Sequence, residues 1–287
     1  MSDTKIEWAT KVWNPIVGCT VHTPGCTNCY AMKMAARLER IAASDNRGLA
    51  HYVGTTKLSK VGAVWTGKIG VAGDDAFLAP LRRKKPTDYF VNSMSDLFHD
   101  AVPIEIIARV FNIMADSPQH TYKVLTKRSD RMLQIMAGPK NHRLWAPKLW
   151  HRSALPNVWL GVSVEDQARR SRIDDLGATP AATRFVSFEP LLGPVDACEP
   201  LGIWWNQTTG AWVREHKPKF DWAIVGGESG PGARPMANKW AQSLVDQCRA
   251  AGVAVFVKQL SSGGPKAIKD IEVFPERLRF REFPCTP

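Results

Sequence analysis

Hydrophobic positions alternate along the chain between two kinds of segment. Short runs rich in β-branched and aromatic residues, typical of strands, occur at 11–17, 64–69, 89–92, 122–126, 158–163, 184–187, 222–226 and 253–257. Most of them precede longer amphipathic segments with helical spacing, at 29–41, 103–115, 129–136, 165–175 and 238–251. Nearly continuous apolar strands that alternate with helices are typical of a parallel sheet covered by helices. The pattern therefore predicts an α/β fold.

Eight strands of this kind favour a (β/α) TIM-like barrel, full or partial, with a doubly wound sheet as the rival arrangement. Two segments, at about 138–157 and 201–220, interrupt the alternation and are too long for ordinary connections. The second contains Trp204, Trp205 and a turn-forming run at 206–210, which predicts an inserted hairpin. No linker-like stretch divides the chain, so we expect residues 1–287 to form a single β/α-barrel domain with two insertions.

Composition and charge narrow the class of protein. The chain is 44% hydrophobic and 23% charged, as in ordinary globular proteins and unlike disordered ones. Its 38 Lys and Arg residues against 27 Asp and Glu residues give a net charge of +11, which favours a nucleotide or nucleic acid as partner. No apolar run approaches the roughly 20 residues of a membrane helix, and the N-terminus lacks the apolar core of a signal peptide. We expect a cytoplasmic protein without a membrane partner; its oligomeric state is not predicted.

Three of the six cysteines, Cys19, Cys26 and Cys29, lie together between the first predicted strand and the first predicted helix, with the spacing C-x6-C-x2-C. Thiolates suit zinc or iron–sulfur clusters, and three of them on a four-iron cluster leave one iron open to an exchangeable ligand. Two other interpretations stay open. His22 completes a zinc site with the three cysteines, or the thiols are separate and buried. We expect a [4Fe–4S] cluster held by the three cysteines.

Polar residues follow the ends of the predicted strands. In a β/α barrel this carboxyl edge of the sheet carries the active site. These residues are Asn92, Ser93, Ser95, Asp96, Thr126, Lys127, Arg128, Ser163, Glu165, Asp166, Glu189, Gly226, Gly227, Glu228, Ser229, Lys258 and Gln259. Each has an ordinary alternative role as a helix cap or a solvated charge. Their recurrence at one strand end after another predicts a ring of ligand-binding groups.

Several common catalytic motifs are missing from the chain. No G-x-G-x-x-G fingerprint or phosphate-loop lysine is present, which disfavours nucleotide phosphate hydrolysis. The histidines show no H-E-x-x-H spacing, and there is no G-x-S-x-G elbow of a serine hydrolase. The sequence thus offers no specific catalytic residue, and the cysteine array is its most informative feature.

Several motifs together resemble a known family. The motifs are residues 13–15, which precede the three cysteines, and residues 92–98, 125–128, 159–165, 188–191 and 225–230. The chain resembles, over nearly its whole length, the phage and bacterial gp-thirty-seven/gp-sixty-eight family, a domain of unknown function. This resemblance implies a phage-related context and no assigned reaction.

More distantly, the chain resembles radical S-adenosylmethionine enzymes, which carry three cysteines after the first strand of a full or partial β/α barrel. The resemblance implies that Cys19, Cys26 and Cys29 ligate the cluster, that S-adenosyl-L-methionine chelates its open iron, and that an external donor supplies an electron for radical hydrogen abstraction. The usual spacing in that superfamily is C-x3-C-x2-C, and the longer first gap here departs from it. The residues implied as cofactor-binding are Ser93, Ser163, Glu165, Glu189, Gly227 and Glu228.

These observations predict a radical S-adenosylmethionine-like iron–sulfur enzyme that modifies a nucleotide, a DNA base or a nucleic acid. Lys127, Arg128 and Lys258 are the expected contacts to substrate phosphates. The alternative is a non-catalytic, zinc-containing nucleic-acid-binding protein whose tryptophan-rich insertions stack on bases. The identity of the metal distinguishes the two hypotheses.

Overall fold

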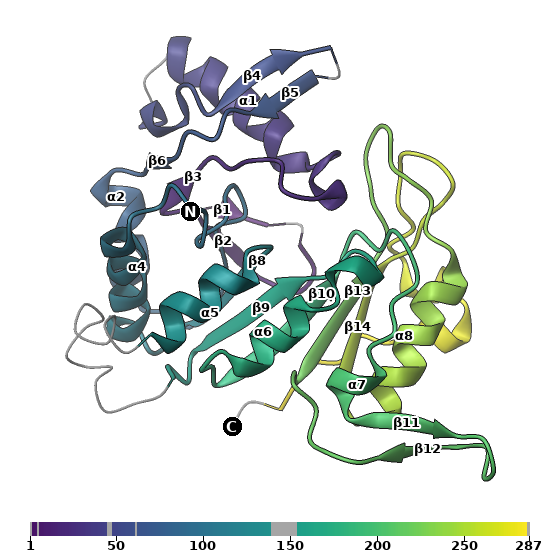
Figure 1. The fold of residues 1–287 in the computed structure, drawn as a ribbon. Helices are drawn as coiled ribbons and strands as arrows, with labels where there is room; N and C mark the ends of the chain where they lie inside the picture. Colours follow the sequence, from purple (N-terminus) through teal and green to yellow (C-terminus); the bar gives the residue numbers. More distant parts are fainter. Residues whose placement is uncertain (1, 5, 45–47, 61, 139–153, 286–287) are drawn as a thin grey trace. The chain divides into compact units, whose positions relative to one another are not determined.

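The computed structural model describes residues 2–4, 6–44, 48–60, 62–138 and 154–285 (Figure 1). It has a mixed α/β fold whose main sheet has the strand order β1-β2-β7-β8-β9-β10-β13-β14. Seven of these strands run parallel and form a half-barrel sheet. They are β2 (Lys11–Trp13), β7 (Asp88–Val91), β8 (Thr121–Thr126), β9 (Val158–Ser163), β10 (Thr183–Phe188), β13 (Trp222–Gly226) and β14 (Ala254–Gln259).

Both edges of the parallel sheet are paired with local segments. Strand β1 (Ser2–Asp3) lies antiparallel to β2. At the other edge, the tail bridges β14 through Arg281 and Phe256, and the Glu282 amide donates to the carbonyl of Val255 at 2.8 Å. These ladders occupy backbone groups that barrel closure requires of the edge strands. The partial form of the predicted barrel is therefore supported, and a full TIM barrel is not confirmed.

The chain divides into two compact units. The first unit is Met1–Trp159 with Pro180–Ala182, and the second is Leu160–Thr179 with Thr183–Pro287. Strand β9 begins in the first unit and ends in the second. The single-domain organisation expected for residues 1–287 stays a prediction.

In the first unit, helices cover the strands and a small subdomain follows the cysteines. The remaining elements are η1 (Pro24–Cys26), α1 (Tyr30–Ser44), η2 (Ala50–Tyr52), α2 (Asp74–Phe77), α3 (Ala79–Arg82), α4 (Ile104–Asp116), α5 (Ser129–Ala137), β3 (Ile16–Val17), β4 (Thr56–Ser59), β5 (Gly62–Trp65) and β6 (Gly70–Val71). Helix α4 buries Ile107, Val110, Phe111 and Met114, the spacing of one apolar helix face. Helix α1 packs against the β4–β5 hairpin (Figure 1).

One predicted strand of the first unit does not join the main sheet. The strand predicted at 64–69 is present only at Val64 and Trp65, which belong to β5 and pair antiparallel with Lys57 and Thr56. Gly62, which begins β5 opposite Ser59, has a φ of 111°, a conformation that favours glycine. Counting this run among the strands of the main sheet was wrong, because an apolar run does not reveal its partner, and here the nearest strand in sequence is used.

The core of the first unit contains a charged side chain. Lys123 in β8 is buried, pairs with Asp88, donates to the carbonyl of Trp8 at 2.9 Å and lies 4.8 Å from the centre of the Trp159 ring. Burial lowers the pKa of Lys123 and raises that of Asp88. Both polar partners are needed to offset the desolvation of this ammonium group.

In the second unit, the elements besides β9, β10, β13 and β14 are η4 (Gln167–Arg169), α6 (Arg172–Ala178), α7 (Cys198–Leu201), β11 (Ile203–Asn206), β12 (Ala211–Arg214), α8 (Asn238–Ala250), η5 (Ile271–Val273) and η6 (Glu276–Leu278). Helix α8 packs against β13 and β14 (Figure 1). The predicted hairpin within 201–220 is confirmed, with Trp205 opposite Trp212. Most of the other predicted insertion, 139–153, lies outside the described residues.

The helix predicted at 165–175 begins later than expected, at Arg172. Glu165 is instead buried in the connection after β9, where it accepts a hydrogen bond from Arg172 at 2.9 Å. None of the helices in the described ranges is long and apolar enough to cross a membrane.

Candidate functional sites

The cysteine loop, residues 19–29, is attached firmly at its start. Gly18 has a φ of 92°, and a Cβ there would lie 2.1 Å from the carbonyl oxygen of Lys68, so only glycine fits. Its amide donates to the carbonyl of Met94 at 3.1 Å, and Gly18 forms a parallel bridge with Ser95. The loop then forms η1 and ends where α1 begins at Tyr30. It is therefore held against the end of β7 and at a helix N-terminus.

All three thiols of the cysteine loop are partly buried and lie near one another. Cys26 interacts electrostatically with both Cys19 and Cys29, and the amide of Cys29 donates to the carbonyl of Cys26 at 3.2 Å. Cys19 and Cys29 also pack against the apolar cluster that contains Val17 and Met32. Of the three predicted ligands, Cys26 is thus the one that interacts with both of the others.

Burial dominates the electrostatics of these thiols. It raises the pKa of Cys19 to about 12, with the charge of Asp96 adding to the effect, and it raises the pKa of Cys29 as well. Metal binding would have to displace these protons. Within the described ranges, no group of three or more His, Cys, Asp and Glu side chains is arranged to hold a metal ion. Ligation by the three cysteines therefore stays a prediction.

Arg128 links the cysteine loop to the end of β8. Its side chain is buried, and the residue is 3% exposed. Nη1 donates to Asp96 Oδ2 at 3.1 Å and to Cys19 Sγ at 3.8 Å, while Nη2 donates to Thr20 Oγ1 at 2.6 Å. Burial alone would lower the pKa of Arg128, but the charges of Asp96 and Cys19 and the hydrogen bonds to both together outweigh it and raise this pKa. Arg128 is therefore a fixed cation beside a candidate ligand.

Asp96 is itself held by several donors. Its Oδ1 accepts from the Thr126 hydroxyl at 2.7 Å and from the Phe98 amide at 3.0 Å. Its Oδ2 accepts from the Lys127 amide at 3.1 Å in addition to Arg128. A carboxylate with this many donors has one fixed position. Asp96 therefore orients Arg128.

His99 completes this polar group. Its Nε2 lies 3.1 Å from Thr20 Oγ1, and its pKa is lowered by burial and by the charge of Arg128. Arg131 holds the same segment through the carbonyls of Phe98, at 3.2 Å, and Val102, at 2.8 Å. The segment after β7 and the start of α5 are thus tied together beneath the cysteine loop.

The end of β7 presents a buried polar group whose hydrogen-bonding capacity is unused. Asn92 is 2% exposed and has a φ of 60°, and both polar atoms of its amide lack a hydrogen-bond partner among the described residues. The neighbouring Ser93, a predicted cofactor ligand, donates to Asn14 Oδ1 at 3.2 Å. A buried amide without partners is costly, so Asn92 is the stronger candidate of the two to contact a ligand. In the sequence it was only one of many strand-end residues.

In the second unit, Glu189, Gly227 and Lys258 belong to one hydrogen-bonded group. Lys258 Nζ donates to Glu189 Oε1 at 2.5 Å. Gln259 Nε2 donates to the carbonyl of Gly227 at 2.7 Å and to Glu189 Oε1 at 3.3 Å. Three adjacent strand ends, of β10, β13 and β14, are joined in this way.

The other two predicted carboxylates of the second unit are paired with arginines. Arg234 donates to Glu228 through Nη2 at 2.6 Å and Nε at 3.0 Å, and these hydrogen bonds raise the pKa of Arg234. Arg172 bonds both Glu165 and the carbonyl of Ser163, at 2.6 Å. The hydroxyl of Ser163 is buried and has no partner among the described residues. Ser163 is thus the second orphaned polar group at a strand end.

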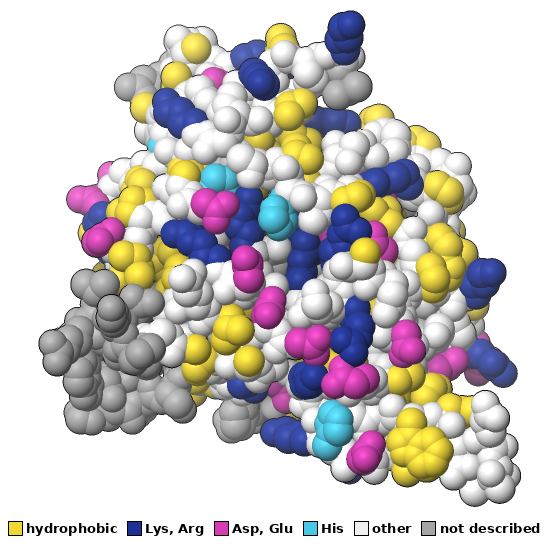
Figure 2. All heavy atoms as spheres, in the orientation of Figure 1, with side chains coloured by type: hydrophobic (Ala, Val, Ile, Leu, Met, Phe, Trp, Pro, Cys, Tyr) yellow, Lys and Arg dark blue, Asp and Glu magenta, His cyan; other side chains and the backbone are white. Residues whose placement is uncertain are grey.

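The predicted phosphate-binding cations are placed differently from one another. Lys127 interacts electrostatically with Cys29, Arg128 is buried against Asp96, and Lys258 is paired with Glu189. On the face drawn in Figure 2, Lys and Arg side chains lie among Asp and Glu side chains. On that face the net charge of +11 does not form a uniform basic surface.

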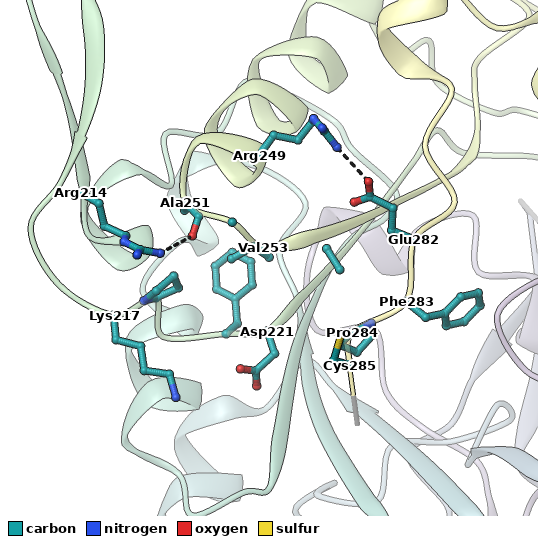
Figure 3. A pocket seen from close by; sticks show the side chains of 14 residues that line it. Arg214, Lys217, Asp221, Arg249, Ala251, Val253, Glu282, Phe283, Pro284 and Cys285 are labelled. Atoms are coloured by element: carbon teal, nitrogen blue, oxygen red, sulfur yellow. Dashed lines mark hydrogen bonds and ion pairs between the residues drawn. The ribbon is translucent and has the colours of Figure 1, made fainter. Parts of the chain in front are cut away.

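A cavity of about 660 Å³ lies at the opposite ends of β13 and β14 within the second unit (Figure 3). Arg249 forms an ion pair with Glu282 across one side of it, and Arg214 donates to the carbonyl of Ala251 at 3.4 Å. Its remaining polar lining includes Lys217 and Asp221. It contains none of the residues predicted from the strand ends.

Comparison with known proteins yields a family and no characterised relative. No curated protein and no solved structure matches the chain. A family model described as a protein of unknown function (DUF5131) matches residues 3–273. Because this match covers nearly the whole chain, the protein belongs to the DUF5131 family of proteins of unknown function.

Proposed function

We propose that the protein is an iron–sulfur enzyme that binds a [4Fe–4S] cluster through Cys19, Cys26 and Cys29 and uses S-adenosyl-L-methionine for radical chemistry. One observation carries the proposal. Three cysteines share one loop, Cys26 interacts electrostatically with the other two, and Arg128 donates to Cys19, which supports the proposal. Thiolates are the ligands that iron–sulfur clusters require.

The donor set fits a cluster in its chemistry. Three protein thiolates leave one iron of a cubane open, which a reactive cluster needs. The start of α1 at Tyr30 places a helix N-terminus just after Cys29, and a helix N-terminus stabilises thiolates. The apolar packing of Cys19 and Cys29 limits access of water, a factor that tunes the reduction potential.

Zinc is the second candidate, because His22 is on the same loop and would supply a fourth ligand. A single tetrahedral zinc ion requires its thiolates about 3.8 Å apart, given Zn–S bonds of about 2.3 Å. In a cluster each thiolate binds a different iron, so the three sulfurs lie farther apart. The two metals therefore impose different geometries on the same loop.

With S-adenosyl-L-methionine, a reduced cluster supplies the electron that cleaves the cofactor. The role of the chain's own residues would be to bind S-adenosyl-L-methionine and to orient it. Candidates in the second unit are the orphaned Ser163 hydroxyl and the carboxylates Glu165, Glu189 and Glu228, with Gly227 allowing close approach of a ligand. Ser93 is the first-unit candidate, beside Asn92.

The proposed substrate is a nucleotide, a DNA base or a nucleic acid. The net charge of +11 supports this class, and Lys127, Arg128 and Lys258 are its proposed phosphate contacts. Since Lys258 is paired with Glu189 and Arg128 with Asp96, a phosphate would have to compete with these carboxylates. An external low-potential electron donor is the second proposed partner.

The proposal is tested by metal analysis of protein purified without oxygen. We expect about four iron and four sulfide per chain, with the broad visible absorption of a cluster. The Cys26→Ala variant should lose them, whereas Cys285→Ala, which removes an exposed thiol outside the loop, should retain them. Cleavage of S-adenosyl-L-methionine by the reduced protein is the second readout. Stoichiometric zinc without sulfide would overturn the proposal in favour of the zinc-binding alternative.

A further inference from the structure

We propose that Arg128 is a positioning residue of the cysteine loop and that it raises the reduction potential of the cluster bound there. This inference rests on the proposed function, because it concerns the same loop. It comes from a contact that the sequence does not suggest, between side chains 109 residues apart.

The guanidinium group of Arg128 donates hydrogen bonds to three side chains at once, and its Nε also lies 3.8 Å from Asp100 Oδ2. Nη1 is shared between Asp96 Oδ2, at 3.1 Å, and Cys19 Sγ, at 3.8 Å, and Nη2 donates to Thr20 Oγ1 at 2.6 Å. The planar fork of arginine spans these partners, whereas the single ammonium group of lysine is a point donor. Arg128 therefore fixes two successive residues of the loop, one of them a candidate ligand.

The orientation of Arg128 is set by Asp96, which is itself held in place. The Asp96 carboxylate accepts hydrogen bonds from the Thr126 hydroxyl at 2.7 Å and from the Lys127 amide at 3.1 Å. The end of β8 therefore holds the carboxylate in place. The buried pair then presents its donor to Cys19 without reorganisation. This geometry belongs to a group built to hold the sulfur in one position.

The charge of Arg128 has a defined consequence for a cluster at Cys19. Reduction transfers one electron from an external donor to the cluster and makes it more negative. A cation and an N–H donor beside a ligating sulfur stabilise the reduced form, and the effect is stronger in a buried, low-dielectric environment. Arginine stays protonated in proteins, so its contribution is permanent. Arg128 should therefore raise the potential.

The test is a mediated potentiometric titration of full-length protein purified without oxygen, followed by EPR of the reduced cluster. In Arg128→Gln we expect iron and sulfide to remain and the reduction equilibrium to shift at least tenfold toward the oxidised form, which is about 59 mV for a one-electron couple. In Arg128→Lys, which retains the charge but loses the fork, we expect a shift of at least threefold in the same direction.

The matched control is Arg131→Gln. Arg131 lies on α5, close in sequence to Arg128, and donates to the carbonyls of Phe98 and Val102. Its loss weakens the same segment, so a shift caused only by loosened structure would appear in this variant too. We expect its potential to equal that of the wild type.

The outcomes separate this inference from the function it rests on. A complete cluster with a lowered potential in both Arg128 variants, and an unchanged potential in Arg131→Gln, supports the inference, whereas loss of iron from a folded Arg128→Lys variant overturns its claim on the potential. A complete cluster with an unchanged potential in the Arg128 variants overturns the inference and leaves the proposed function standing. If Arg128→Gln does not fold, Arg128→Lys decides, since it keeps a cation opposite Asp96. A wild type without iron and sulfide overturns both proposals.

Discussion

The cysteine-loop region of the first unit and the strand-end region of the second unit both contain a buried carboxylate–arginine ion pair, but the arginine has different further partners in the two regions. In both, a carboxylate at or near a strand end is paired with a cation, as in Asp96–Arg128 and Glu165–Arg172. Only Arg128 extends beyond its carboxylate to a cysteine sulfur. In the second unit, Arg172 turns to a backbone carbonyl, that of Ser163. The same pair thus serves a candidate metal ligand in one region and local structure in the other.

This difference determines whether a ligand must break an existing ion pair in order to bind. Around the cysteine loop the Asp96–Arg128 ion pair already contacts Cys19, so the proposed cluster would add to an existing network. At the second-unit strand ends, Glu189 and Glu228 are occupied by Lys258 and Arg234, and a ligand must displace a cation or bind beside the pair. The orphaned groups Asn92 and Ser163, one in each unit, need no such displacement.

The largest expected effect comes from removing the Asp96 charge. Asp96→Asn leaves buried Arg128 with only the exposed Asp100, 3.8 Å from its Nε, as counter-ion, which should lower the free energy of unfolding by about 3–5 kcal/mol. The matched variant Glu228→Gln should cost about 1–3 kcal/mol, because the Arg234 side chain is 34% exposed and can be hydrated. Chemical denaturation of both variants measures the difference. Equal losses would show that the two pairs contribute alike and would break the comparison.

A smaller effect is expected at Lys258, the cation of the second-unit strand ends. Lys258→Met leaves Glu189 with Gln259 as its remaining donor and should destabilise the protein by about 1.5–3 kcal/mol. The double variant Lys258→Met/Glu189→Gln should recover most of this loss, since both charges are gone. A double-mutant cycle measured by denaturation gives the coupling. A double variant as unstable as the sum of the singles would contradict a direct pair.

The sequence predicted those parts of the molecule that depend on local pattern. The ranges 158–163 and 222–226 match β9 and β13 to the residue, because continuously apolar runs bounded by polar residues are recognisable alone. The hairpin within 201–220 was found for a similar reason, from its turn residues. The region 64–69 failed because strand pairing depends on a partner that the run itself does not specify.

In the candidate site, too, some features can be predicted from the sequence and others depend on the fold. The cysteine spacing is visible in the sequence, and so are the strand-end residues. The contact of Arg128 with Cys19 and that of Lys258 with Glu189 are not, because the partners lie 109 and 69 residues apart. The orphaned state of Asn92 and Ser163 is equally hidden, since it depends on what all neighbouring groups do. The helix predicted at 165–175 was misplaced, because the polar run at its start gives no sign that Glu165 is buried and paired with Arg172 ahead of the helix.

Substitutions of the two orphaned groups, Ser163 and Asn92, should change the stability of the protein little and its binding of S-adenosyl-L-methionine strongly. Ser163→Ala removes an unpartnered buried hydroxyl and should change stability by less than about 0.5 kcal/mol. Asn92→Gly should cost at most about 1 kcal/mol, because glycine tolerates the φ of 60° at this position. If these groups contact S-adenosyl-L-methionine, equilibrium dialysis should show at least tenfold weaker binding for each. Unchanged binding in both variants would remove them from the site.

The smallest effect is expected from an exposed ion pair of the second unit, which sets the scale against which the buried pairs are judged. Burial alone would raise the pKa of Asp174, but Lys219, at 2.8 Å, and Arg170 outweigh it and lower this pKa. A lowered folded-state pKa gives stability that is present above the unfolded-state pKa of about 3.9 and is lost as the pH falls through the folded-state value. The Asp174 side chain is 39% exposed, so screening limits this contribution to about 0.5 kcal/mol or less.

The measurement compares the free energies of unfolding of wild type and Asp174→Asn at pH 7 and at pH 3 and below. The gap between them should be small at pH 7 and should shrink further in acid, and Lys219→Met should show the same trend because it removes the partner. A gap that widens as the pH falls would mean that Asp174 holds its proton more tightly in the folded state, the reverse of the assigned direction. A gap at pH 7 as large as that of Asp96→Asn would show that burial does not separate the two kinds of ion pair.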